Sequence, residues 1–74
     1  LENDWVKSLV EIADTFELEA DLRISDSNMV ANSFYENAIQ AYRDIPLKFR
    51  TNYQVEEKIQ KLKKKKKFIR TSFA

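Results

Sequence analysis

Apolar residues recur at steps of three and four along the first third of the chain. The stripe expected to face a core consists of Trp5, Leu9, Ile12, Ala13, Phe16 and Ala20. Val6, Val10 and Ile24 flank this stripe. Because a helix turns about 100° per residue, these positions share one arc, and the pattern predicts an amphipathic helix over about 4–24. Asn3 or Asp4 is the predicted N-cap of this helix.

A second amphipathic pattern follows a polar turn. Segment 25–28 reads Ser-Asp-Ser-Asn, which is typical of turns and helix caps. Beyond it, a broad apolar arc consists of Val30, Ala31, Phe34, Tyr35, Ala38, Ile39, Ala41, Tyr42 and Ile45. The arc predicts a helix over about 28–45, ended by Pro46 and antiparallel to the first because the connection is short. Its tyrosine hydroxyls are expected at the edge of the core, within reach of water.

The last part of the chain predicts a third, basic helix over about 52–72. Segment 47–51 fits either a short helical turn or a loop. Thr51 or Asn52 would cap the helix, with Gln54 as a capping-box partner. A narrow apolar seam with one interruption, Lys66, is formed by Val55, Ile59, Leu62, Lys66, Ile69 and Phe73. The sequence therefore predicts an all-α fold: an antiparallel hairpin with a third basic helix packed on it through this seam.

Charge is distributed unevenly along the chain. Of the 74 residues, positions 1–46 hold three Lys/Arg and ten Asp/Glu, a net −7, whereas positions 47–74 hold ten and two, a net +8. The total of +1 therefore conceals two oppositely charged halves. Such asymmetry favours either charge complementarity within the molecule or two faces offered to different partners.

The basic run leaves several interpretations open. It consists of Lys61, Lys63, Lys64, Lys65, Lys66, Lys67 and Arg70. Consecutive lysines point in all directions around a helix, so the run is first interpreted as a solvated helix end whose charge the acidic first helix partly balances. The alternatives are binding of an acidic protein partner, sequence-independent binding of nucleic acid, and contact with an anionic membrane surface. Phe68 beside the run could stack on a base.

Composition excludes several kinds of site. The chain has no Gly, Cys or His, so it offers no disulfide, no thiolate or imidazole zinc site and no Cys or His nucleophile. The carboxylates Glu11, Asp14, Glu17 and Asp21 are expected on the outer, solvated side of the first helix. We therefore expect no catalytic site, no metal, no cofactor and no small-molecule substrate, and the chain is predicted not to be an enzyme.

Neither a membrane span nor a signal peptide is evident in the sequence, so a cytoplasmic location is expected. The chain begins with Leu1 and not Met, and we expect it to be a segment of a longer protein. Three apolar residues, Leu18, Leu22 and Phe68, lie off the predicted core stripes and are candidates for partner contact. The favoured function is a protein-interaction or scaffold module that binds a partner or self-associates, with nucleic-acid binding through the third helix as the alternative.

The second predicted helix carries a recognisable pattern of small and aromatic residues. Ala31, Tyr35, the pair Ala38-Ile39 and Pro46 follow the order found in tetratricopeptide repeats, so residues 5–46 resemble one such helical hairpin. The proline comes about three residues late, the first helix lacks a small residue in the usual crossing position, and a single hairpin is present, whereas an array needs about three repeats. The resemblance implies a non-catalytic protein-binding scaffold. The whole chain is also similar to helical amino-terminal segments of larger bacterial proteins of uncharacterised function.

Overall fold

The computed structural model describes residues 2–73, with side chains described over 4–69. Within this part the chain forms four α-helices and a 3-10 turn, and no strand. The elements are α1 (Glu2–Arg23), α2 (Asn28–Arg43), α3 (Leu47–Arg50), η1 (Thr51–Tyr53) and α4 (Val55–Phe73). The all-α prediction is confirmed, and the three long helices lie close to their predicted bounds. Segment 47–51, for which the sequence allowed either a short helical turn or a loop, is helical.

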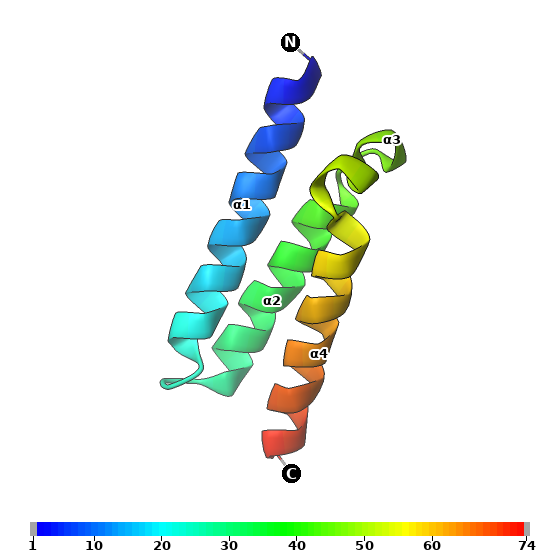
Figure 1. Ribbon diagram of the computed structural model, residues 1–74. Helices are drawn as coiled ribbons and strands as arrows, with labels where there is room; N and C mark the ends of the chain where they lie inside the picture. Colours follow the sequence, from blue (N-terminus) through cyan, green and yellow to red (C-terminus); the bar gives the residue numbers. More distant parts are fainter. Residues whose placement is uncertain (1, 74) are drawn as a thin grey trace.

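The three long helices lie side by side. In Figure 1, α1 and α2 form an antiparallel hairpin, and α4 packs against α2 and runs in the same direction as α1. The two termini therefore lie at opposite ends of the molecule. No helix of the described residues is both long and apolar enough to cross a membrane.

The hairpin is closed by buried alanines. Both helices contribute fully or almost fully buried alanines, namely Ala13, Ala20, Ala31, Ala38 and Ala41. Side chains this small let the two backbones approach closely. Ala13 and Ala20 of α1 are both completely buried, so the first helix also supplies small residues to the hairpin interface.

The predicted core face of α1 is rotated in the structure. Val6 and Val10 are buried, whereas Trp5 is 49% exposed and Ile12 is 46% exposed. Leu9 and Phe16 are only partly buried. Asp14, Glu17 and Asp21 of α1 lie beside the buried face and pair with lysines of α4, so the side of α1 that packs on the other helices does not coincide with its apolar stripe.

The turn between α1 and α2 is as predicted. Ser27 is the N-cap of α2, and its Oγ accepts a hydrogen bond from the backbone N–H of Val30 at 3.3 Å. The backbone N–H groups of Asp26 and Ser27 donate to the carbonyl of Arg23, which closes α1. The predicted caps Asn3 and Asp4 are wrong, since α1 already begins at Glu2 and both residues lie within the helix.

Arg50 holds the far end of α2. Its guanidinium donates to the carbonyl oxygens of Arg43 at 2.7 Å and Ile45 at 2.9 Å, and it pairs with Glu56 at 3.1 Å. These carbonyls lie where α2 ends, before Pro46, and they cannot be paired by a further helical turn. One side chain therefore joins the end of α2 to the first turn of α4.

The start of α4 differs from the prediction. Thr51 and Asn52 lie in η1, and neither is the cap. Instead Gln54 adopts a left-handed conformation (φ 55°, ψ 39°), and its carbonyl accepts from the N–H of Lys58. A left-handed residue usually is glycine, and because the chain has none, this turn retains backbone strain of about 1 kcal/mol.

The apolar seam of α4 is confirmed. Val55, Ile59, Leu62 and Ile69 are all buried. Lys66, the predicted interruption, is partly buried beside them and reaches Glu36 of α2. Phe73, the last predicted seam residue, lies outside the described side chains.

Candidate functional site

An ionic network joins α1 to α4. Its members are Asp14, Glu17 and Asp21 on α1 and Lys58, Lys61 and Lys65 on α4. The strongest contacts are those of Lys65, whose Nζ lies 2.8 Å from Glu17 Oε2 and 3.1 Å from Asp21 Oδ1. Asp14 and Asp21 remain about half exposed, as the sequence suggested, whereas Glu17 is largely buried. All three pair with lysines of α4, so the first helix balances part of the lysine charge.

Two tyrosines of α2 lie beneath this network. The hydroxyl of Tyr35 donates to Asp21, and the hydroxyl of Tyr42 donates to Asp14. The same carboxylates pair with lysines whose ammonium groups lie over the tyrosine rings: Lys65 is 5.7 Å from the Tyr35 centroid. Both tyrosine side chains are completely buried, so the expectation that their hydroxyls reach water is wrong.

The arrangement is repeated once along the helices. Asp14, Tyr42 and Lys58 form one unit, with Lys58 Nζ 5.6 Å from the Tyr42 centroid and 3.7 Å from Asp14. Asp21, Tyr35 and Lys65 form the second, seven residues away on each helix. Seven residues are about two helical turns, so both units lie on the same side of the three helices.

Burial and hydrogen bonding set the protonation of these groups. Burial raises the pKa of Tyr35 and of Tyr42 well above the usual range, and the carboxylates that accept hydrogen bonds from their hydroxyls add to the shift. Burial alone would raise the pKa of Asp21, but the hydrogen bonds from Tyr35 and Lys65 outweigh it and lower that pKa. For Lys65, burial opposes the charged form, yet Glu17 and Asp21 raise its pKa.

We expect the free energy of unfolding to fall at both ends of the pH range, in an alkaline limb and in an acid limb. The raised pKa values of Tyr35, Tyr42 and Lys65 give stability that is complete below about pH 10 and is lost as pH rises toward the folded values. The lowered pKa of Asp21 gives stability that is present above about pH 4 and is lost as pH falls through the folded value. Urea midpoints measured by circular dichroism across pH would show a plateau between these limits.

The control for the alkaline limb is the double variant Tyr35→Phe/Tyr42→Phe, which keeps both rings and removes both titrating hydroxyls. Its alkaline limb should be flatter than that of the unaltered chain. An unchanged alkaline limb would show that other groups cause it.

Each carboxylate of the ionic network is paired with a lysine or a tyrosine, so the network joins α1 to both α2 and α4. The described side chains form no group of three or more His, Cys, Asp or Glu residues that could hold a metal ion.

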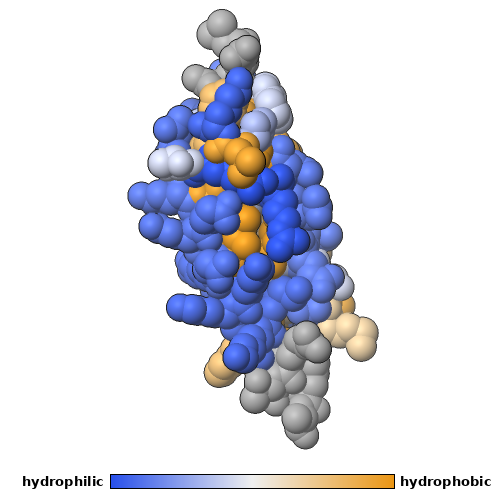
Figure 2. All heavy atoms as spheres, turned by 90° about the vertical axis from the view of Figure 1, so that its right-hand side faces the viewer, coloured by the Kyte–Doolittle hydropathy of each residue, from blue (hydrophilic) through white to orange (hydrophobic). Residues whose placement is uncertain are grey.

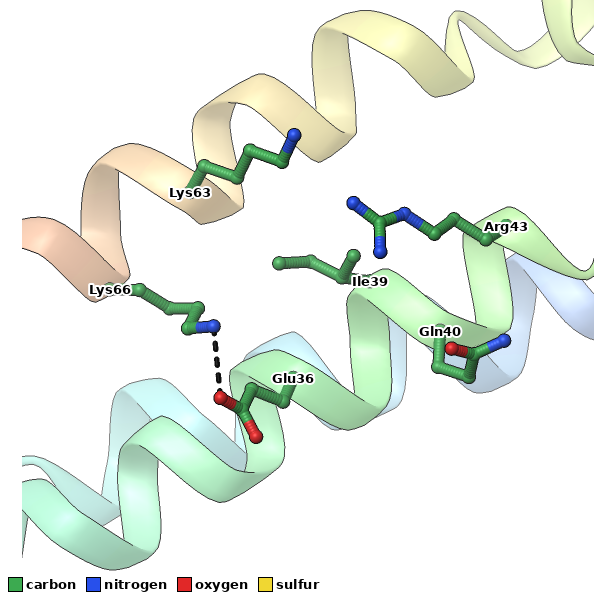
Figure 3. Close-up of a pocket in the computed structure, with 6 residues that line it drawn as sticks. All are labelled: Glu36, Ile39, Gln40, Arg43, Lys63 and Lys66. Carbon is green, nitrogen blue, oxygen red and sulfur yellow. Dashed lines mark hydrogen bonds and ion pairs between the residues drawn. The ribbon is translucent and has the colours of Figure 1, made fainter.

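A basic groove lies on the other side of α4, between it and α2 (Figure 3). It has a volume of about 300 Å³ and is lined by Glu36, Ile39, Gln40, Arg43, Lys63 and Lys66. Ile39, only 6% exposed, forms its floor. Lys66 Nζ is paired with Glu36 Oε1 at 3.0 Å, while Lys63 from α4 and Arg43 from α2 extend toward one another. Of the six lining residues, the sequence singled out only Lys63 and Lys66 as candidates. Arg43 is the basic residue that sequence reasoning missed, because it belongs to the acidic half of the chain.

An apolar hollow of about 310 Å³ lies where α4 passes the end of α1. It is lined by Asp21, Ile24, Tyr35, Lys64, Lys65, Phe68 and Ile69. Phe68, a predicted partner contact, is 76% exposed here. Ile24 was placed on the flank of the core stripe in the sequence, but it is 41% exposed and stands at the same hollow.

The other predicted contacts are scattered. Leu18 and Leu22 are about 60% exposed, as expected from their position off the core stripe, but they do not line the apolar hollow. The basic run divides among three surfaces: Lys61 and Lys65 belong to the ionic network, Lys63 and Lys66 to the basic groove, and Lys64 to the apolar hollow. Lys67 is exposed, and Arg70 lies outside the described side chains.

The surface on the α4 side reflects this division. Figure 2 shows a mostly hydrophilic face on which a limited hydrophobic area is visible between charged side chains. A continuous apolar patch is absent from the part of this face that the described residues form.

Comparison with known proteins gives no family assignment. No protein-family model matches the chain, and no curated protein or solved structure matches it. The resemblance of residues 5–46 to a tetratricopeptide hairpin stays a prediction.

Proposed function

We propose that the chain is a non-catalytic protein-interaction or scaffold module: a tetratricopeptide-like hairpin extended by a basic helix. Its partner is a protein segment that is both apolar and acidic. The observation that carries this proposal is the apolar hollow. There Ile24, in the turn after α1, and Phe68, on α4, expose apolar surface beside Lys64 and Lys65.

The hollow can supply binding energy through Phe68. Removing a large apolar side chain from water contributes about 1.5–3 kcal/mol, and exposed aromatic residues are frequent anchors of protein interfaces. The half-exposed Ile24 adds apolar surface to the same contact.

Charge specifies the kind of segment. Asp21 is already engaged by Tyr35 and Lys65, so the rim keeps an unbalanced positive charge from Lys64. An acidic residue beside an apolar anchor fits such a rim, whereas a basic segment would be repelled.

Nucleic-acid binding through α4 is less well supported. Lys58, Lys61 and Lys65 are paired with carboxylates of α1, which removes them from the set that could neutralise phosphates. Binding that required these lysines would have to break the ionic network.

The proposal is tested with a defined probe, a synthetic amphipathic helix that carries leucines at i and i+4 and glutamates elsewhere. We expect saturable binding by calorimetry, and Phe68→Ala should weaken it by about tenfold. Because Phe68 is 76% exposed, this change should leave the fold intact.

Leu47→Ala is the matched control, since Leu47 is also 76% exposed but lies in α3 and away from the apolar hollow. A second control peptide replaces the glutamates by lysines and should not bind. Equal weakening by both variants, equal binding of both peptides, or no binding at all would each refute the proposed site.

A further inference from the structure

The basic groove holds positive charge that the protein does not neutralise. Of the residues with described side chains, none forms an ion pair with Arg43 or with Lys63. Their charged groups nevertheless extend toward one another across the hollow from α2 and α4 (Figure 3). Two like charges so placed repel, and an anion between them would convert this repulsion into attraction.

Lysines on the two sides of α4 differ in this respect. On the α1 side, Lys58, Lys61 and Lys65 each have a carboxylate partner supplied by the fold. On the α2 side, Lys63 has none among the described residues, and Lys66 has only Glu36, whose side chain is 58% exposed. Because water screens the exposed Glu36 carboxylate, a pair of this kind contributes on the order of 1 kcal/mol, and the Lys66 ammonium can turn toward a more highly charged anion in the groove.

We propose that the basic groove binds the phosphoryl group of a phosphate monoester. Arg43, Lys63 and Lys66 approach from different directions and suit the three terminal oxygens of a tetrahedral group, and a guanidinium can donate two parallel hydrogen bonds. Three cations and Glu36 give the lining a net charge of +2, which matches the charge of about −2 on a monoester at neutral pH. The nearly buried Ile39 at the floor limits water on one side and strengthens these contacts.

This inference is independent of the proposed function, because the groove and the apolar hollow share no lining residue. The chemistry of the groove specifies the phosphoryl group and not what carries it. A phosphorylated side chain and a small phosphorylated metabolite both present the same oxygens.

The test is a titration of the isotope-labelled chain, followed by nuclear magnetic resonance, with capped phosphoserine and separately with glycerol phosphate. We expect saturable shifts confined to residues around Arg43 and Lys63, and the tighter of the two probes identifies the kind of carrier. Arg43→Gln and Lys63→Gln should each weaken binding by about tenfold. Since the second pKa of a monoester is about 6, binding should weaken by about fourfold from pH 7.5 to pH 5.5.

Lys64→Gln is the matched control: it removes the same charge from the neighbouring position, but Lys64 does not line the groove. This variant should bind phosphoserine and glycerol phosphate as tightly as the unaltered chain does. Equal weakening by Lys64→Gln, no saturable binding of either monoester, or shifts outside the groove would overturn the proposal. An oligonucleotide without a terminal phosphate carries only phosphodiesters. If it binds more tightly per phosphate than the two monoesters do, the proposal is overturned in favour of a phosphodiester ligand.

Discussion

Tyr42→Ala is expected to lower the free energy of unfolding by about 3–5 kcal/mol. The Tyr42 side chain is completely buried, and it lies where α1, α2 and α4 meet. A chain of this size has a total stability of about 4–11 kcal/mol, so the variant should be largely unfolded at moderate temperature. Urea denaturation followed by circular dichroism measures the loss directly.

Tyr42→Phe separates the ring from the hydroxyl. This variant keeps the buried ring and loses only the hydrogen bond to Asp14, whose carboxylate is about half exposed and can turn to water. We expect a loss of about 1–2 kcal/mol. If Tyr42→Phe costs as much as Tyr42→Ala, the hydroxyl and not the packing of the ring holds the helices together.

Tyr53→Ala is the control for removal of a tyrosine elsewhere. Tyr53 lies in η1 and is only partly buried against the core. Its removal should therefore cost less than that of Tyr42. An equal loss would indicate that the connection before α4, and not the centre of the three helices, limits stability.

Patterns of apolar spacing were most informative for α2 and α4. Each of these helices has a single buried side, so most of the arc of α2 and the described part of the apolar seam of α4 could be predicted from period alone. The exceptions in α2 are Val30, which is 42% exposed, and Phe34, which is only partly buried. For α1 the helical period was predicted correctly, but the side of the helix that is buried was not, since Trp5 and Ile12 remain half exposed. The charged side of α1 contacts α4 through ion pairs, and the spacing of apolar residues carries no information about where such pairs form.

The ionic network did leave a signal in the sequence. Asp14 and Asp21, Tyr35 and Tyr42, and Lys58 and Lys65 are three pairs with the same seven-residue spacing on three predicted helices. Matching spacings on neighbouring helices indicate side chains that can meet at two successive levels. What the sequence lacked was the relative rotation of the helices, which decides whether acids and lysines face each other or the solvent.

The basic groove could not be predicted in this way. Its arginine comes from a segment of net negative charge, and it is brought beside Lys63 only because α4 folds back along α2. The basic groove and the apolar hollow are both lined by residues of α4, so they exist only while this helix packs on the hairpin. Loss of α4 packing should abolish both at once.

Leu62→Ala is expected to detach α4 from the hairpin, at a cost of about 2–5 kcal/mol. Leu62 is completely buried near the middle of the apolar seam, and most other positions of α4 are charged and contribute little to packing. The remaining anchors, Val55, Ile59 and Ile69, lie toward the two ends of the described seam. Hydrogen exchange should show α4 amides exchanging more than about tenfold faster than in the unaltered chain.

Lys63→Ala is the matched control for this detachment, because Lys63 is next to Leu62 in the sequence but is exposed and is not a seam residue. It should leave exchange in α4 unchanged while it weakens binding of phosphoserine. Leu62→Ala should weaken binding of phosphoserine and of the acidic amphipathic peptide together, since both hollows need α4 in place. If Leu62→Ala loses exchange protection in α4 but still binds both probes, then α4 alone carries the two binding surfaces, and their dependence on α2 is refuted.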